Sequence, residues 1–143
     1  MARINFFTED STHTLKHKTI IKKWIEATIV AEGYKLHELN FILCSDDYLL
    51  RINQDFLQHD DYTDVITFDN SEELKMIVGD IFISIDRIKE NAKNFGSKTI
   101  IELCRVIIHG TLHLLGYKDK TKQAKTLMTS KEDFYLEKLE LEG

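Results

Sequence analysis

The 143-residue sequence contains no proline, only two cysteines, no repeat and no long hydrophobic run. Two cysteines, Cys44 and Cys104, are too few for a disulfide framework, so we expect a reducing compartment. Each lies in an apolar run, which predicts a buried free thiol. No segment approaches the ~20 apolar residues that a membrane span needs, and the N-terminal apolar run is too short for a signal peptide. These absences predict a cytoplasmic protein without a membrane partner.

Positive charge is also in deficit, because the formal net charge at pH 7 is −5. This balance argues mildly against nucleic acid as a partner. The charge is uneven, however, and lysines gather in two short stretches: Lys16, Lys18, Lys22 and Lys23, and then Lys118, Lys120, Lys122 and Lys125. Such a basic rim beside an acidic body either holds phosphate groups or forms an ordinary solvated face. The sequence leaves both interpretations open.

Hydrophobic periodicity and capping residues divide the chain into alternating elements. They predict strands at residues 3–7, 36–44, 64–68 and 76–85, and helices at 15–32, 45–56, 86–95, 97–116 and within 121–141. Ser45, Asp86 and Ser97 are expected to begin three of the helices. This order indicates an α+β fold, with a small mixed sheet of about four strands covered by about five helices. In the last helix, the expected core contacts are Phe134, Leu136, Leu139 and Leu141.

The helix at 97–116 carries a pattern that is typical of a catalytic metal site. His109 and His113 are four residues apart, so they project from one face of the helix, one turn apart. Gly116 allows the chain to leave the helix and turn back, and Asp119 then supplies a third ligand. Cys104 lies about 140° around the helix from His109 and is not expected to join them. Three protein ligands leave a fourth position open, as in catalytic zinc sites.

The spacing of these ligands is also that of the metzincin peptidases, but the general base of a peptidase is missing. In those enzymes a glutamate follows the first histidine, and here that position is Gly110. Glu102 lies on the same helix face, roughly 10 Å away along the axis, which is too far to reach a water on the metal. A conventional metallopeptidase is therefore disfavoured.

The chain resembles the YbeY family of bacterial metal-dependent endoribonucleases, which are associated with 16S ribosomal RNA maturation and ribosome quality control. The family pattern His-Gly-x-x-His-Leu-x-Gly-Tyr stands at residues 109–117. Two further family segments precede this pattern, in the order in which the family has them. The first comprises Asn53, Phe56 and residues 63–68, and the second comprises residues 79–84. The resemblance implies a single hydrolase domain over residues 1–143 with a zincin-like metal-site helix. It also implies one Zn²⁺ ion on His109, His113 and Asp119, with other divalent transition metals possible.

Three positions depart from the family pattern. Asp119 stands where the family usually has a third histidine; aspartate is a competent zinc ligand, but its charge favours some tolerance for harder ions such as manganese or nickel. Tyr62 stands where proline is common. Leu57 stands where the family usually has an arginine implicated in nuclease activity, and leucine cannot stabilise a phosphorane-like charge. Either another cation, Lys118 or Lys120, replaces it, or nuclease activity is weak or absent.

The preferred hypothesis is a single-strand-directed, metal-dependent endoribonuclease that acts in late 16S rRNA 3′-end maturation and ribosome quality control, with ribosomal RNA or a ribosomal subunit as partner and no DNA. The alternative is a non-catalytic ribosome-assembly factor with a structural metal. The catalytic residues are not identified. His59 is a candidate general base or an ordinary loop histidine. Asp64 either orients a metal-bound histidine or caps the start of a strand. The oligomeric state stays open.

Overall fold

The structure is a computed structural model that describes residues 2–10, 13–57 and 63–141. His59 and Tyr62 lie outside the described residues. The elements follow the predicted order: β1 (Arg3–Glu9), α1 (Lys18–Ala31), β2 (Lys35–Cys44), α2 (Asp46–Leu57), β3 (Val65–Asp69), β4 (Met76–Ser84), α3 (Ile85–Phe95), α4 (Thr99–Leu114) and α5 (Lys122–Leu136). None of the helices in these ranges combines the length and apolarity that crossing a membrane requires.

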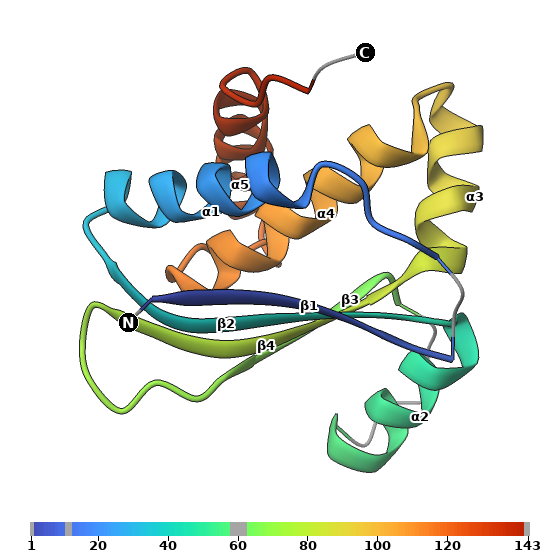
Figure 1. The fold of residues 1–143 in the computed structure, drawn as a ribbon, viewed down its shortest axis with the longest axis horizontal. Helices are drawn as coiled ribbons and strands as arrows, with labels where there is room; N and C mark the ends of the chain where they lie inside the picture. Colours follow the sequence, from blue (N-terminus) through green and yellow to red (C-terminus); the bar gives the residue numbers. More distant parts are fainter. Residues whose placement is uncertain (1, 11–12, 58–62, 142–143) are drawn as a thin grey trace.

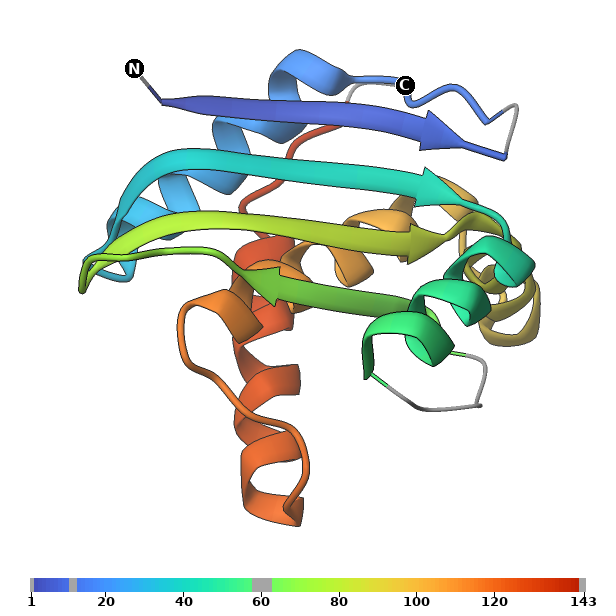
Figure 2. The same ribbon diagram turned by 90° about the horizontal axis from the view of Figure 1, so that it is seen from below.

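The four strands form one mixed sheet in the order β1-β2-β4-β3 (Figure 2). Strands β1, β2 and β4 are parallel, and β3 pairs with β4 in the antiparallel direction. Strand β3 therefore forms one edge of the sheet. The predicted α+β fold with a small mixed sheet is confirmed.

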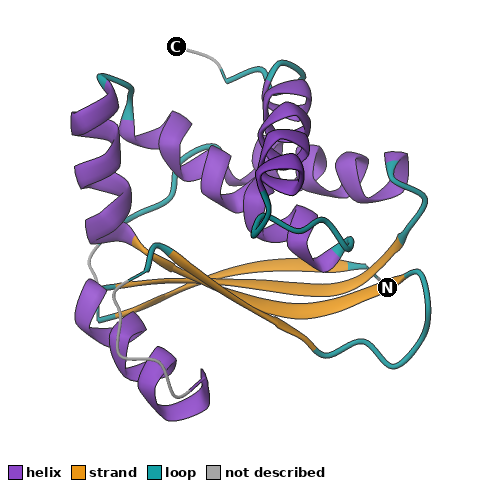
Figure 3. Ribbon diagram, turned by 180° about the vertical axis from the view of Figure 1, so that it is seen from behind, coloured by secondary structure: helices purple, strands orange, loops and turns teal. Residues whose placement is uncertain are grey.

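Helices α1, α4 and α5 lie on one face of the sheet, whereas α2 lies on the other (Figures 1 and 3). Strand β4 contributes to two clusters on opposite faces of the sheet. Ile81 and Ile83 lie in the main core, whereas Phe82 packs against the smaller cluster beneath α2. Residues of β4 and α4 share the main core. Burying an isoleucine side chain contributes roughly 1.5–3 kcal/mol to folding, so this core holds α4 against the sheet.

Both cysteines are buried and free, as predicted. Burial raises the pKa of Cys104 to about 12. Burial, together with nearby carboxylates such as Asp10 and Asp86, raises the pKa of Cys44 to about 12. Because thiolates are the reactive form of cysteine, neither residue is equipped for nucleophilic or metal chemistry.

The prediction for the first residue of each helix was right for α2 and wrong for α3 and α4. Ser45 caps α2, with its Oγ accepting from the backbone N–H of Tyr48 at 3.1 Å. Helix α3 is capped by Ser84 and not by Asp86, because β4 runs into the helix without a loop. Ser97 does not begin α4, since its N–H completes the end of α3 by donating to the carbonyl of Ala92.

The buried side of α5 differs in part from the prediction. Its buried residues are Met128, Glu132 and Tyr135, which share one helix face. Phe134 was expected in the core, but it is half exposed because it lies next to this stripe rather than on it. The predicted leucines are partly buried against the core, at positions Leu136, Leu139 and Leu141.

Candidate metal centre

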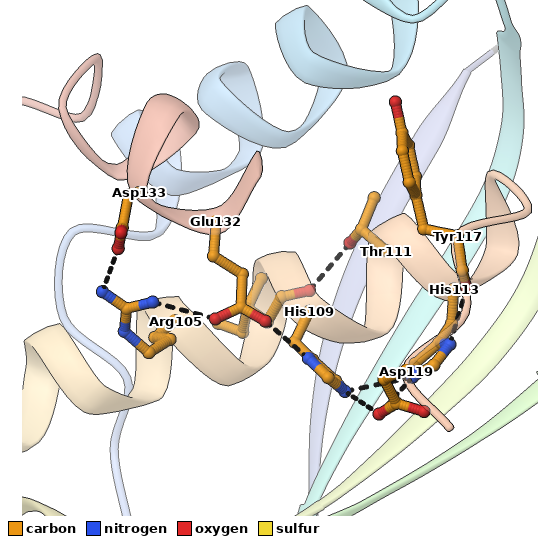
Figure 4. A network of polar contacts seen from close by, with 9 residues as sticks. Arg105, His109, Thr111, His113, Tyr117, Asp119, Glu132 and Asp133 are labelled. Atoms are coloured by element: carbon orange, nitrogen blue, oxygen red, sulfur yellow. Dashed lines mark hydrogen bonds and ion pairs between the residues drawn. The ribbon is translucent and has the colours of Figure 1, made fainter. Parts of the chain in front are cut away.

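Helix α4 and the turn after it bring the three predicted ligands together. His109 and His113 project from the last two turns of the helix. Gly116 has a positive φ of 100°, and the N–H of Tyr117 donates to the carbonyl of Leu112 at 3.1 Å, which closes the end of the helix. The chain then folds back and places Asp119 in front of both imidazoles (Figure 4).

The three ligand atoms form a compact triangle. His109 Nε2 lies 3.0 Å from His113 Nε2, and each of these atoms lies 3.3 Å from Oδ2 of Asp119. Ligand atoms around a tetrahedral zinc ion, with bonds of ~2.0–2.1 Å, are separated by roughly 3.3 Å. The three residues therefore fit one transition-metal ion. Among the described residues, they are the histidine, cysteine and acidic side chains that lie close enough together to hold one.

Hydrogen bonds on the far side of each ring leave both Nε2 atoms free for a metal. His113 Nδ1 lies 3.0 Å from the carbonyl oxygen of Tyr117. Since a carbonyl only accepts, His113 carries its proton on Nδ1. His109 Nδ1 lies 2.6 Å from Oε2 of Glu132, whose ionised carboxylate also accepts. Two nitrogen lone pairs and a carboxylate oxygen then face one another, and they repel unless a proton or a cation lies among them.

The electrostatics of the triad favour positive charge. Burial lowers the pKa of His109, but the hydrogen bond and the charge of Glu132 outweigh this effect. The nearby carboxylates of Asp119 and Asp64 act in the same direction, so the pKa of His109 is raised above its usual value. The same negative charges that hold a proton on the ring attract a divalent cation to this point.

The triad lies in a cleft of about 680 Å³ between α4, the turn after it and the edge strand β3. Asn53 and Leu57 of α2 form the opposite wall, and Lys120 stands beside Asp119. Of the two lysines considered as replacements for the family arginine, Lys120 lines the cleft and Lys118 does not. Asp64 also lines the cleft. It does not orient either imidazole through Nδ1, because Glu132 and the carbonyl of Tyr117 occupy these positions.

Gly110 shows why a peptidase base is absent. A Cβ atom at this position would lie 2.9 Å from Cγ2 of Ile81 in β4, because the helix is pressed against the sheet there. A glutamate side chain at Gly110 would enter the core and not the cleft. Glu102 does not line the cleft either.

Glu132 was not predicted from the sequence to be part of the site. It is 23 residues from His109, and its side chain is only 8% exposed. The available indication was a carboxylate in the stripe Met128–Glu132–Tyr135 at spacings of four and three, where an apolar residue is expected. A buried carboxylate in such a stripe indicates a charged or hydrogen-bonding partner.

The fold and the cleft define a class of protein, an α+β domain that presents two histidines and a carboxylate on one helix and the turn after it. Residues 3–140 match the family described as Endoribonuclease YbeY. The chain belongs to this family.

Relatives and a solved structure extend this finding. The chain is 54% identical over 130 residues to a Cytophaga hutchinsonii protein named Endoribonuclease YbeY, covering 91% of each. It is 44% identical over 130 residues to the protein of that name from Christiangramia forsetii, covering 91% of this chain and 90% of that protein. The solution structure of a Thermotoga maritima protein superposes with a TM-score of 0.66 at 31% identity, covering 96% and 89% of the two chains.

Proposed function

We propose that this chain is a metal-dependent endoribonuclease that acts on single-stranded RNA in late 16S rRNA 3′-end maturation and ribosome quality control. Its cofactor is one Zn²⁺ ion, its partner is ribosomal RNA or a ribosomal subunit, and its place of action is the cytoplasm. Membership of the family and the activity named for its relatives support RNA cleavage.

The observation that carries the proposal is the meeting of three ligand atoms at an open cleft. His109, His113 and Asp119 converge where two ring lone pairs and a carboxylate face each other. Two imidazole nitrogens and one carboxylate oxygen suit zinc, and they also admit other divalent transition metals. The opening toward Asn53 and Leu57 leaves room for a phosphodiester in front of these ligands.

A divalent ion held there would supply Lewis-acid polarisation of a phosphate oxygen and would lower the pKa of its water toward ~7. The residues of the cleft would bind the RNA and supply charge to its phosphate. Lys120 is the cation on the cleft wall that offers a phosphate contact, whereas the Leu57 wall offers none. RNA carries its own 2′-hydroxyl nucleophile, so a cleft without a strong general base can still support cleavage.

The proposal is tested by comparing wild type with His113→Ala. Bound metal is measured in both proteins, and cleavage of a structured 16S rRNA 3′-end fragment is assayed with and without chelator. We expect the wild type to lose cleavage with chelator and His113→Ala to lose both metal and cleavage. Product ends of 2′,3′-cyclic phosphate indicate attack by the 2′-hydroxyl, whereas simple hydrolysis leaves none. Equal cleavage by both proteins would identify a contaminating nuclease and overturn the proposal.

The second candidate, a ribosome-assembly factor with a structural metal, is favoured by Leu57, because this position lacks the arginine that the family resemblance leads us to expect. In that case, removing the metal would unfold the protein, and the purified chain would show no turnover in the same assay. Melting the protein with and without chelator therefore separates the two functions.

A further inference from the structure

Glu132 of α5 connects the candidate metal centre to a second charged residue. One carboxylate oxygen, Oε2, lies 2.6 Å from His109 Nδ1, and the other, Oε1, accepts from Nη1 of Arg105 at 2.8 Å (Figure 4). Arg105 also pairs with the exposed Asp133 at 2.7 Å. The two oxygens of Glu132 therefore face two different groups, one on each side.

Both contacts of Glu132 require an acceptor. Arg105 has only N–H donors, so the oxygen beside it must accept. The ring of His109 binds a metal through Nε2 only when its proton is on Nδ1, so the oxygen beside Nδ1 must also accept. Only an ionised carboxylate presents acceptors in both directions, and the burial of this side chain is offset by its two partners.

We propose that Glu132 is a positioning residue that sets His109 in the Nδ1–H tautomer, with Arg105 making a carboxylate at this position obligatory. This inference rests on the proposed metal centre, because the tautomer matters there for presenting Nε2. Glu132 comes from α5, so packing of the last helix and presentation of a ligand on α4 are coupled through one side chain.

The substitution Glu132→Gln tests this logic, since it keeps the shape and removes one acceptor. Arg105 takes the amide oxygen, and the amide NH₂ then faces His109 Nδ1. The ring must accept there, which moves its proton to Nε2, into the position that the metal needs. Removing Arg105 as well, in Arg105→Met/Glu132→Gln, frees the amide to turn its oxygen toward His109 and restores the original tautomer.

The tautomer is measured directly by two-bond ¹H–¹⁵N correlations of the imidazoles in the metal-free protein, at a pH where the ring is neutral. We expect Nδ1–H in wild type, Nε2–H in Glu132→Gln, and Nδ1–H again in the double variant. Zinc affinity is expected to fall about 10- to 100-fold in Glu132→Gln and to recover in the double variant. Asp133→Asn is the matched control, because Asp133 contacts Arg105 but is not a partner of His109 in the described structure. It should leave both readouts unchanged.

A merely structural role for Glu132 predicts lower thermal stability without a tautomer change and without rescue by the second substitution. An Nε2–H ring in wild type would overturn the inference even if the variants do not fold. An unchanged tautomer in Glu132→Gln would overturn it while leaving the metal proposal in place. A tautomer switch in a protein whose wild type binds no zinc would support the role of Glu132 in setting the ring and overturn the proposed function.

Discussion

Gly110 of helix α4 lies directly against Ile81 of strand β4, with 2.9 Å between the position of an added Cβ atom and Ile81 Cγ2. This contact falls in the helical turn between His109 and His113. It holds that turn close to the sheet, so both imidazoles are directed outward over the edge strand β3. The glycine that removes a peptidase base is therefore required by packing.

Replacing Gly110 by alanine should destabilise the protein. Overpacking a rigid core costs about 1–3 kcal/mol. Because Ile81 is fully buried, it cannot easily move aside, and we expect a cost in the upper part of this range, about 2–3 kcal/mol. The better helix propensity of alanine returns about 1 kcal/mol. We expect a net loss of about 1–2 kcal/mol in the free energy of unfolding, measured by urea denaturation of the metal-free protein. Unchanged or increased stability would show that the helix is not pressed against Ile81.

Asp119 should be a ligand that histidine can replace and alanine cannot. Asp119→Ala is expected to weaken zinc binding by more than the ~10–100-fold that loss of an outer partner costs. Asp119→His restores the residue that the family resemblance implies. It should retain zinc and shift the preference away from manganese, because imidazole is a softer donor than carboxylate. Competition titrations against a metal-binding dye measure both; unchanged zinc affinity in Asp119→Ala would exclude it as a ligand.

Lys120 should contact a phosphate of the bound RNA. Lys120→Ala is expected to weaken RNA binding and to reduce the slope of log affinity against log salt by about one. Lys118→Ala is the matched control, because this neighbouring lysine is exposed but does not line the cleft. Fluorescence anisotropy at several salt concentrations gives both slopes. Equal effects of the two substitutions would indicate a diffuse basic surface and no specific contact.

Leu57→Arg should increase RNA cleavage. Leu57 is 42% exposed and lines the cleft, so an arginine fits there with little change in stability. A guanidinium aimed at the developing phosphorane charge is expected to raise the cleavage rate by at least about tenfold. Leu57→Met serves as a control of similar size without charge and should behave as wild type. A variant with bound metal and an unchanged rate would exclude this wall from transition-state stabilisation.

The grouping of the three candidate metal ligands was predictable from sequence because these residues are close together in the chain. His109 and His113 are one helical turn apart, and Gly116 indicates the turn that returns Asp119. The strands were predictable for the same reason, since each has its own apolar pattern. Their order in the sheet depends on which distant strands pair, which a single sequence does not specify.

Glu132 illustrates what local pattern cannot supply. Its function depends on His109, 23 residues away, and on the angle at which α5 packs on α4. Hydrophobicity alone predicts that Phe134 is buried and Glu132 exposed, whereas the structure half-exposes Phe134 and buries Glu132. The paired charge of Arg105 makes a buried carboxylate tolerable there, and this pairing appears only once both helices are assembled.

The most direct test is a zinc titration of the metal-free wild-type protein, with RNA cleavage and bound metal followed in the same samples. The structure brings His109, His113 and Asp119 together as a candidate site for one ion. The proposal therefore predicts that cleavage rises in proportion to bound zinc and reaches its plateau at one equivalent. Cleavage that is already complete without metal, or that stays absent at one equivalent in the folded protein, would contradict a metal-dependent endoribonuclease centre in this cleft.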